Sequence, residues 1–268
     1  MSRRARLDAE LVRRGLARSR EHAVALVSAG QVRVPGRAVL KPASQVDAAE
    51  AISVSEQASD DYVSRGGHKL AGALDVFMAA GLTVAGRRCL DAGASTGGFT
   101  DVLLRRGAAG VVCVDVGYGQ LAWSLQTDER VEVRDRTNVR TLDIAPVDPP
   151  VDLVVADLSF ISLRLVLPAL VASATPDADL VPMVKPQFEV GKERLGSGGV
   201  VRDPRVRAAA VTEVARAAYD GHGLGVLGVT ASPLPGPMGN VEYFLWLRGG
   251  APPLDEQALR QAVEEGPS

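Results

Sequence analysis

The sequence contains little of what several protein classes require. Its 268 residues include two cysteines, Cys89 and Cys113, and three scattered histidines, so neither a disulfide framework nor a metal site is expected. Both cysteines lie in apolar, strand-like runs, which predicts buried, reduced thiols. No apolar run approaches the roughly 18 residues of a membrane span. The charged start MSRRARLDAELV lacks the apolar core of a signal peptide. We therefore expect a cytoplasmic monomer without a metal.

The charge of the chain is distributed unevenly. The whole sequence has a formal net charge of -2, and 46% of its residues are hydrophobic, as in ordinary globular proteins. Residues 1–42, however, contain ten Lys and Arg against three acidic residues, a balance of +7. Such an asymmetry indicates a surface for a polyanion. The alternative is a solvated helix surface, which more acidic residues among the arginines would favour.

The first part of the chain predicts a small α+β domain. Apolar spacing and glycines indicate helices over 5–15 and 19–30, with Ser19 as the N-cap of the second, and short strands over 31–34, 37–40 and 51–54. The polar stretch SEQASDD then indicates a linker. We place this domain at 1–59, the linker at 60–66 and a second domain at 67–268.

The second domain alternates between apolar β runs and helices, which predicts a mostly parallel sheet covered on both faces. Helices are expected over 67–80, 97–106, 119–127, 162–173 and 204–222, and strands over 88–92, 110–115, 131–134, 152–156, 179–184, 225–230 and 241–247. Only the loop SPLPGPMGN separates the last two strands, which is short for a parallel crossover, so the last strand is expected to be antiparallel. A seven-stranded, doubly wound, Rossmann-like sheet of this kind is the shape of class I methyltransferases, which use S-adenosylmethionine.

A glycine-rich turn follows the first strand of this sheet, in DAGASTGGFTDVLL. It matches neither the G-x-G-x-x-G dinucleotide pattern nor the G-K-[ST] of a P-loop. Ligands bind at the carboxyl ends of strands in such sheets, and acids at the next strand ends suit the amino, ribose and adenine groups of S-adenosylmethionine. For Asp115, a simple turn-forming role is the alternative. The predicted cofactor residues are Asp91, Gly93, Ser95, Gly97, Gly98, Phe99, Asp115, Asp135 and Asn138.

Two lysines and two carboxylates are expected at the same edge. Asp157 and Lys185 end the fourth and fifth strands, and Glu242 begins the last strand. Lys69 lies early in the helix before the first strand and can fold over this edge. Such groups can pair, and burial can lower the pKa of a lysine enough for base chemistry. An ordinary salt-bridge network is the alternative.

These residues carry a resemblance to a known family. The order Lys69–Asp157–Lys185–Glu242 is similar to the K-D-K-E tetrad of FtsJ/RrmJ-type ribose 2′-O-methyltransferases. The strings YVSRGGHKL, LDAGASTGGFTD, DVGYGQLAWSL, VVADLSFISL, VKPQFEVGK and SPLPGPMGNVEYFLW resemble the TlyA family of haemolysins and rRNA methyltransferases. The first 55 residues resemble the S-four-type RNA-binding domain. The chain departs from many FtsJ relatives by having Thr96 where those have proline.

The resemblance covers nearly the whole chain and implies an activity. It implies methyl transfer from S-adenosylmethionine to the 2′-OH of cytidine in 16S and 23S rRNA, without a metal, as in the longer, actinobacterial type. Lys185 would orient and help to deprotonate the hydroxyl, the two acids would hold the lysines, and Lys69 would stabilise negative charge. RNA phosphates would be bound by Arg4, Arg6, Arg14, Arg18, Arg20 and Arg65. Phe99, Tyr118, Phe160 and Phe188 could stack on a base or equally be core residues.

Two other functions remain open on the sequence. The family also carries the name haemolysin, which a pore-forming protein would explain, although the sequence contains no membrane span. Lysis of liposomes by the purified protein would support that function. A non-catalytic RNA-binding factor for ribosome assembly is the third hypothesis, and transfer of labelled methyl groups to rRNA would exclude it.

Overall fold

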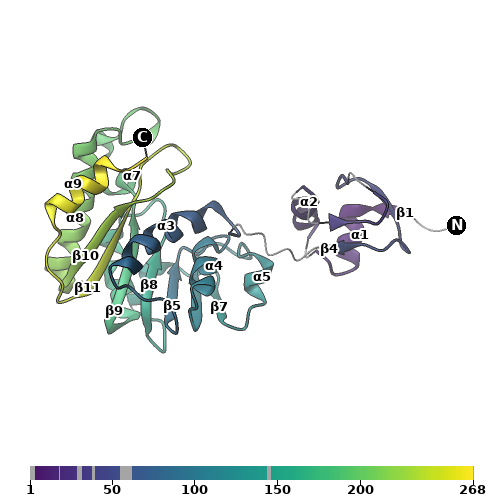
Figure 1. The fold of residues 1–268 in the computed structure, drawn as a ribbon, viewed down its shortest axis with the longest axis horizontal. Coiled ribbons are helices and arrows are strands. Elements are labelled where there is room, and N and C mark those ends of the chain that lie inside the picture. Colours follow the sequence, from purple (N-terminus) through teal and green to yellow (C-terminus); the bar gives the residue numbers. More distant parts are fainter. Residues whose placement is uncertain are drawn as a thin grey trace. The chain divides into compact units, whose positions relative to one another are not determined.

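The structure is a computed structural model that describes residues 4–17, 19–28, 32–37, 40–54, 62–143 and 146–267. The chain forms two compact units, residues 1–61 and 62–268, each of which is described by itself (Figure 1). The expected linker at 60–66 is too long at its C-terminal end. Helix α3 (Arg65–Ala79) begins within it, and the backbone N–H of Val63 donates to Asp101 Oδ2 at 2.9 Å. Residues 60 and 61 lie outside the described part.

The N-terminal unit has two helices and two small antiparallel strand pairs. The helices are α1 (Leu7–Arg13) and α2 (Arg20–Ser28), and β1 (Arg4–Arg6) pairs with β3 (Gln45–Asp47) as β2 (Val32–Arg33) pairs with β4 (Ser53–Val54). Ser19 caps α2 as expected, because its Oγ accepts a hydrogen bond from the N–H of His22 at 3.1 Å. The described ends of the expected strand at 37–40 are not in a strand, and residues 38–39 lie outside the description. Strands β1 and β3 were missed because three residues show no clear alternation.

The second unit contains the expected seven-stranded sheet. Its order is β10 (Leu224–Ala231), β11 (Tyr243–Gly249), β9 (Ala174–Val184), β8 (Val151–Ala156), β5 (Arg88–Ala92), β6 (Gly110–Val114) and β7 (Val131–Arg134). Strand β11 runs antiparallel to both of its neighbours, and the other pairs are parallel. The prediction of one reversed strand is therefore confirmed.

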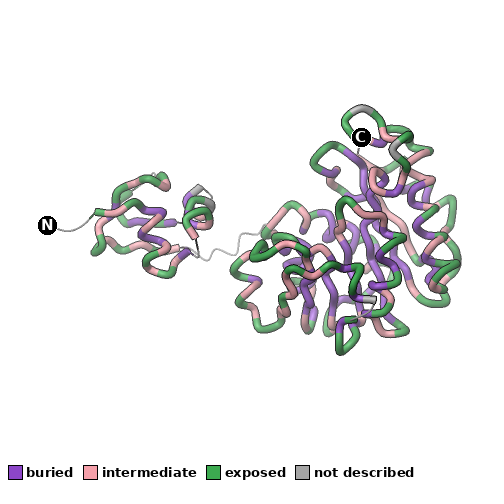
Figure 2. The backbone as a smooth tube through the Cα atoms, turned by 180° about the vertical axis from the view of Figure 1, so that it is seen from behind, coloured by how far each residue is buried: buried purple, intermediate pink, exposed green. Residues whose placement is uncertain are grey.

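Alternating side chains of the sheet build two cores, one on each face. The strands of the sheet are largely buried, as their purple colour in Figure 2 shows. In β8, Val154 and Ala156 point to one face, and Leu153 and Val155 point to the other. The first face is covered by α6 (Leu167–Ala172), α8 (Pro204–His222) and α9 (Glu256–Glu264), and the second by α3, α4 (Gly98–Arg105) and α5 (Trp123–Gln126). This arrangement leaves the carboxyl ends of the parallel strands at one edge, where ligands bind in such sheets.

Two predicted helices are shorter than expected. The segment 162–173 forms a 3-10 turn, Leu163–Leu165, and then α6, because Pro168 starts a new helix at the first turn. The segment 119–127 contains only the four residues of α5, since Gly119 adopts a positive φ of 62° before it. The short helix α7 (Pro186–Glu189) follows β9 and was not predicted.

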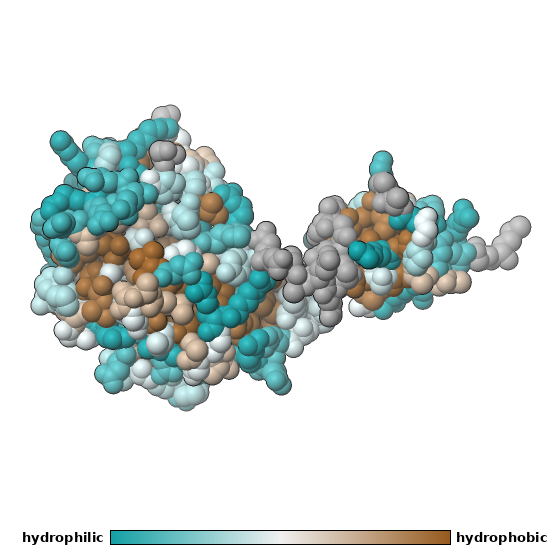
Figure 3. Space-filling model, in the orientation of Figure 1, coloured by the Kyte–Doolittle hydropathy of each residue, from teal (hydrophilic) through white to brown (hydrophobic). Residues whose placement is uncertain are grey.

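The visible face of the second unit is mixed in polarity (Figure 3). Apolar residues, drawn in brown, gather where Figure 1 draws β10 and β11, and hydrophilic residues in teal lie above them. Val76 of α3 and Leu227 of β10 are 51% and 39% exposed. The edge strand β10 thus keeps part of its apolar surface in contact with solvent.

Candidate active site

Strained backbone gathers at the carboxyl ends of the parallel strands. Among the described residues, three that are not glycine have a positive φ: Ser95 (47°), Arg136 (54°) and Phe160 (63°). They follow β5, β7 and β8 respectively. Such conformations cost free energy in residues with a side chain, and they cluster at functional sites. Their common position indicates that this edge of the sheet is built for a ligand rather than for stability.

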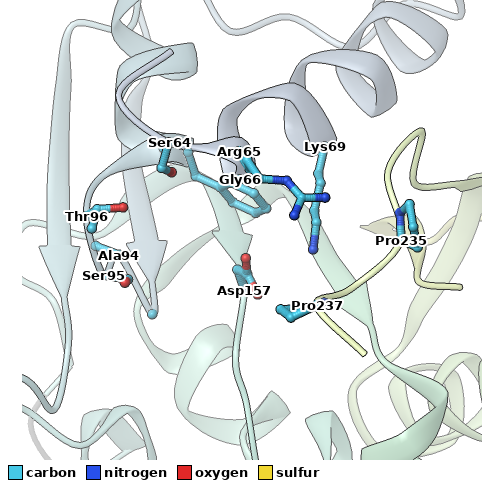
Figure 4. Close-up of a pocket in the computed structure, with 13 residues that line it drawn as sticks. Ser64, Arg65, Gly66, Lys69, Ala94, Ser95, Thr96, Asp157, Pro235 and Pro237 are labelled. Atoms are coloured by element: carbon cyan, nitrogen blue, oxygen red, sulfur yellow. The ribbon is translucent and has the colours of Figure 1, made fainter. Parts of the chain in front are cut away.

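A cavity of about 220 Å³ lies at this edge (Figure 4). Its walls come from the start of α3, the glycine-rich loop, the end of β8 and the proline-rich loop before β11. The lining residues are Ser64, Arg65, Gly66, Lys69, Gly93, Ala94, Ser95, Thr96, Gly98, Phe99, Asp157, Pro235 and Pro237. Ligand pockets usually have volumes of about 300–1,000 Å³, so this cavity suits one part of a larger ligand.

The four residues of the predicted tetrad form two ion pairs. Lys69 Nζ donates to Glu242 Oε2 at 2.6 Å, and Lys185 Nζ lies 2.5 Å from Asp157 Oδ1. Lys69, Lys185 and Glu242 are 8%, 7% and 1% exposed, whereas the side chain of Asp157 is 23% exposed, so the first pair is shielded from bulk water and the second is partly open at its acid. One member of each pair, Lys69 and Asp157, lines the cavity (Figure 4). The structure thus brings the tetrad together around one space, as expected.

Neighbouring side chains hold the second pair in place. Lys185 Nζ also donates to Ser159 Oγ at 2.9 Å. Glu189, four residues after Lys185, accepts hydrogen bonds from Ser162 Oγ at 2.5 Å and from the N–H of Leu163 at 2.7 Å. Burial raises the pKa of Glu189 although these hydrogen bonds oppose the shift. The loops after β8 and β9 are therefore joined at Lys185 itself and again at Glu189.

The glycines of the loop have packing roles that differ from one another. A Cβ on Gly93 would lie 2.5 Å from the carbonyl oxygen of Asp157, so glycine permits the close approach of two loops. A Cβ on Gly97 would meet Leu125 at 2.3 Å and Leu121 at 2.7 Å, and Gly97 has φ of 95°. Gly97 does not line the cavity. Apolar side chains fill the space beside Gly97, and its expected contact with the cofactor stays a prediction.

Asp91 stabilises the glycine loop from below. Its side chain is fully buried, and Oδ2 accepts hydrogen bonds from the N–H and the Oγ1 of Thr100 at 3.0 and 2.7 Å. Burial raises the pKa of Asp91 to about 7 despite these hydrogen bonds. Oδ1 has no partner among the described residues. Asp91 does not line the cavity, so its visible role is to hold the first turn of α4.

The acids after the next two strands bind loop backbone. Asp115 accepts hydrogen bonds from the N–H groups of Ser95 and Gly117 at 2.8 and 2.6 Å, and Asp135 accepts one from Gly119 at 2.8 Å. Asn138 Oδ1 accepts a hydrogen bond from the N–H of Arg140 at 3.0 Å. The turn-forming alternative is thus part of what Asp115 does. None of the three lines the cavity, and their contacts with a ribose or adenine remain predictions.

The aromatic candidates separate into core and surface residues. Phe99 is 3% exposed and packs on Phe244, with ring centroids 5.9 Å apart. Phe160 is 91% exposed, and its ring centroid lies 5.2 Å from that of Phe188, whose ring is 6.0 Å from Lys185 Nζ. Tyr118 is 70% exposed beneath the guanidinium of Arg136 at 4.3 Å. Phe160 is the aromatic side chain best placed to meet a substrate at the tetrad.

Sequence reasoning did not identify Ser64, Pro235 and Pro237 as site residues. Ser64 precedes α3 and lies against the start of α4, where a Cβ on Gly98 would meet its Oγ at 2.3 Å. The two prolines belong to the loop that connects β10 to β11. Only the string YVSRGGHKL and the loop SPLPGPMGN marked these segments, and neither string shows which residues face the cavity.

The predicted RNA-binding arginines differ in how free their charges are. Arg4 is exposed on β1, and the structure shows no interaction of its guanidinium within the described ranges. Arg6 donates to both carboxylate oxygens of Asp8, and Arg20 lies 3.5 Å from the same carboxylate. Arg65 belongs to the other unit, is exposed and lines the cavity. Arg18 lies outside the described residues.

Arg14 is a structural residue of the N-terminal unit. Its Nε donates to Glu10 at 2.7 Å, and its other nitrogens donate to the carbonyl oxygens of Asp47, Ala48 and Glu50 at 3.2, 2.9 and 2.7 Å. These bonds use its donors inside the unit, so the prediction that Arg14 binds phosphate is not supported. Over residues 1–54 the same ten basic side chains face five acidic ones, a balance of +5 rather than the +7 of residues 1–42.

The described residues show no cluster of three or more His, Cys, Asp or Glu side chains that could hold a metal. Cys89 and Cys113 are buried free thiols, and burial raises the pKa of Cys89 to about 12. Among the same residues, no helix has the length and apolarity needed to cross a membrane.

Comparison with known proteins identifies the family to which the fold belongs. Residues 62–249 match the family model described as FtsJ-like methyltransferase, and residues 5–52 match the S4 domain. The chain belongs to the FtsJ-like methyltransferase family. It is 60% identical, over the full length of both chains, to the 16S/23S rRNA (cytidine-2′-O)-methyltransferase TlyA of Mycobacterium tuberculosis. The resemblance inferred from the motifs is thereby confirmed.

Other relatives of this methyltransferase carry the haemolysin name. It is 34% identical to Hemolysin A of Brachyspira hyodysenteriae, over 89% of this chain and 98% of the relative. A solved structure from Streptococcus thermophilus, provisionally named a hemolysin, has a TM-score of 0.70 at 36% identity and covers 99% of this chain and 98% of its own.

The family implies S-adenosylmethionine, and the residues at the cavity fit it. The first turn of α4 presents backbone N–H groups that have no partner within the helix, beside the hydroxyls of Ser64, Ser95 and Thr96, which suits a carboxylate. Asp157 supplies a negative charge on the opposite wall, which suits a sulfonium or an ammonium group. The donor and acceptor set is therefore that of an amino-acid moiety that carries positive charge.

Proposed function

We propose that this methyltransferase transfers a methyl group from S-adenosylmethionine to the 2′-OH of cytidine in 16S and 23S rRNA. The observation that carries the proposal is the arrangement of two lysine–carboxylate pairs around the cavity beside the glycine loop. The identity of 60% to an enzyme with this name supports the choice of substrate. Such a substrate implies that the protein acts in the cytoplasm on rRNA or ribosomal subunits, and we expect it to act as a monomer.

The cofactor would lie along the edge formed by β5, β6 and β7. Its methionine part would occupy the cavity against Ser64, Ser95 and Gly98, and its ribose and adenine would lie toward Asp115 and Asp135. Asp91 would act on it only through the loop that Thr100 joins to Asp91. When bound, S-adenosylmethionine supplies an electrophilic methyl group, so no metal is needed for the transfer.

The tetrad activates the ribose hydroxyl. The Lys185–Asp157 pair is anchored by Ser159, so Lys185 can orient the 2′-OH, and the Asp157 carboxylate, the unprotonated member of the pair, can receive its proton as the oxygen attacks. Lys69, held by Glu242, faces the same cavity and stabilises negative charge on that oxygen. The pairing of each lysine with an acid keeps both long side chains in one conformation, which places the reacting groups before the substrate arrives.

RNA would be bound by both units. In the N-terminal unit, the exposed Arg4 is the best candidate for a phosphate contact, with Arg6 and Arg20 sharing their charge with Asp8. At the catalytic edge, Arg65 meets the cavity, and the exposed ring of Phe160 offers a surface on which a base could stack beside Lys185.

Transfer of a labelled methyl group tests this function directly. The purified full chain should label 16S and 23S rRNA in ribosomal subunits, and mapping of 2′-O-methyl groups should locate the label at cytidines. Label on a base, or on protein alone, would contradict the proposal. Release of dye from liposomes by the same preparation, without methyl transfer, would instead favour the haemolysin hypothesis.

A further inference from the structure

One glycine in the proline-rich loop lies against the tetrad. Gly236 belongs to the segment 232–240, between β10 and β11, and its neighbours Pro235 and Pro237 line the cavity. A Cβ on Gly236 would lie 2.6 Å from Glu242 Oε1 and 3.3 Å from Glu242 Cδ. The other oxygen of that carboxylate, Oε2, accepts the hydrogen bond from Lys69. The space that a side chain would need at Gly236 is therefore occupied by the acid of the first ion pair.

The backbone conformation does not require glycine at this position. The φ of Gly236 is not among the positive values found in the described residues, unlike that of Gly239 at 85°. A left-handed φ therefore does not exclude alanine here, and the nearest steric conflict would be with one flexible side chain. A collision with the end of a side chain is relieved when that side chain moves. At Gly236, the group that must move is the Glu242 carboxylate.

The loop itself cannot easily move away. The N–H of Gly236 donates to the carbonyl of Asn240 at 2.9 Å, and the N–H of Ser232 donates to the carbonyl of Glu242 at 2.8 Å. Asn240, 3% exposed, accepts a hydrogen bond from the N–H of Val201 at 2.9 Å and donates to the carbonyl of Gly199 at 3.1 Å. On the other side, Pro233 packs against Gly72 of α3, where an added Cβ would lie 2.8 Å from Pro233 Cγ. The loop is thus fastened on three sides around Glu242.

We propose that Gly236 is a positioning residue for methyl transfer. Because Gly236 has no side chain, the Glu242 carboxylate has room beside it and can hold Lys69 toward the reacting oxygen. This inference rests on the proposed function. It assigns the proline-rich loop a role in aligning the tetrad in addition to forming a wall of the cavity. It also explains why a buried position with ordinary backbone angles is occupied by glycine.

The variant Gly236→Ala tests the proposal in the full-length protein. We expect kcat for rRNA methylation to fall about 10- to 100-fold, since a displacement of about 1 Å at a catalytic group can cost that much. KM for rRNA, the affinity for S-adenosylhomocysteine measured by calorimetry, and the melting temperature should remain those of the wild type. Gly221→Ala, in α8, is the matched control, because nothing lies within 4 Å of its Cβ. It should leave kcat unchanged.

A second substitution separates positioning from a general structural effect. Glu242→Asp shortens the side chain by one methylene, which withdraws the carboxylate from the new methyl group. In the double variant Gly236→Ala/Glu242→Asp, kcat should therefore exceed that of Gly236→Ala alone, as expected for residues in direct contact. A purely structural defect in the loop would not be relieved by a shorter acid.

Three outcomes would overturn the inference. Wild-type kcat in Gly236→Ala, with Glu242→Ala inactive, would show that Gly236 does not position the acid, while the proposed function would stand. A loss of cofactor affinity or melting temperature in Gly236→Ala, without rescue in the double variant, would assign Gly236 to the fold alone. Full activity in Glu242→Ala would remove the tetrad role itself and the inference with it.

Discussion

Glu10 in the N-terminal unit and Asp91 in the catalytic unit are both buried carboxylates, 2% and 0% exposed, but their pKa values move in opposite directions. Hydrogen bonds from Arg13 and Arg14 lower the pKa of Glu10 to about 2. Burial raises the pKa of Asp91 to about 7, although Thr100 donates two hydrogen bonds to it. The first acid is matched by cations of its own unit, and the second is not.

This difference extends to the basic residues of the two units. In the N-terminal unit, Arg6, Arg13, Arg14, Arg20 and Arg37 all pair with acids of the same unit, so the count of arginines exceeds the charge that is available to RNA. In the catalytic unit, the lysines that pair with acids do so at the cavity. Ion pairs therefore stabilise structure in both units, as Arg87–Asp179 does in the second, and we propose that two pairs of the second unit also align a reaction centre.

The largest expected effect is the loss of catalysis in the variant Lys185→Ala. The kcat for rRNA methylation should fall about 10²- to 10⁴-fold, the usual contribution of a group that handles a proton. S-adenosylhomocysteine should still bind, because Lys185 is not a wall of the cavity. Lys41→Ala, an exposed lysine of the other unit, is the control and should keep kcat at saturating rRNA. Near-normal turnover of Lys185→Ala would mean that the ion pairs at the cavity are structural, like those of the N-terminal unit.

Removal of residues 1–61 should weaken RNA binding next most strongly. The affinity of the full chain for rRNA should fall with salt, by a log–log slope of roughly 0.7 to 0.9 per phosphate contacted. The truncated chain, residues 62–268, should show a flatter slope and still bind S-adenosylhomocysteine, because its sheet has its own two cores. Equal methylation rates for both chains at physiological salt and limiting rRNA would contradict this division of labour.

Arg4 and Arg14 provide a sharper comparison within the N-terminal unit. Arg4→Ala should reduce the salt slope by about the value of one phosphate contact and leave the unit equally stable. Arg14→Ala should instead destabilise the unit by about 1–3 kcal/mol, because Glu10 and three carbonyl groups lose a donor. Hydrogen exchange of residues 4–54 measures the stability, and salt titration of binding measures the slope. The reverse pattern would make Arg14 an RNA contact.

The smallest effect should appear in the pH dependence of stability. A raised folded pKa means that the contribution of Asp91 is fully present below its ordinary pKa of 3.8 and is lost as pH rises through about 7. The lowered pKa of Glu10 means that its contribution is present above the ordinary 4.5 and is lost as pH falls toward about 2. Hydrogen exchange should thus show the catalytic unit weakening as pH rises from about 4 to about 7, and the N-terminal unit weakening in acid.

Single substitutions test the pH dependence of each unit separately. Asp91→Asn should abolish the weakening of the catalytic unit between about pH 4 and 7, and Glu10→Gln should abolish the acid sensitivity of the N-terminal unit. Each pKa unit corresponds to about 1.4 kcal/mol. If both variants keep the wild-type pH profile, other groups determine the stability of the two units.

The sequence by itself determined the architecture of this protein. Apolar runs of strand length between amphipathic helices predict all seven strands of the large sheet, and a connection of nine residues, 232–240, predicts that the last strand is antiparallel. Both features depend on local periodicity and on loop length, which a sequence displays directly. Strand ends likewise predicted that the four tetrad residues would meet at one edge.

Only the tertiary structure decided which groups pair and which roles they have. Lys69 and Glu242 are 173 positions apart, and their hydrogen bond depends on how α3 packs against the loop before β11. Packing within the N-terminal unit likewise turned Arg14 inward. In the catalytic unit, packing filled the space beside Gly97 with leucines and brought Gly236 against Glu242. Partners and burial arise from contacts between distant segments, and such contacts leave no periodic signal in the sequence.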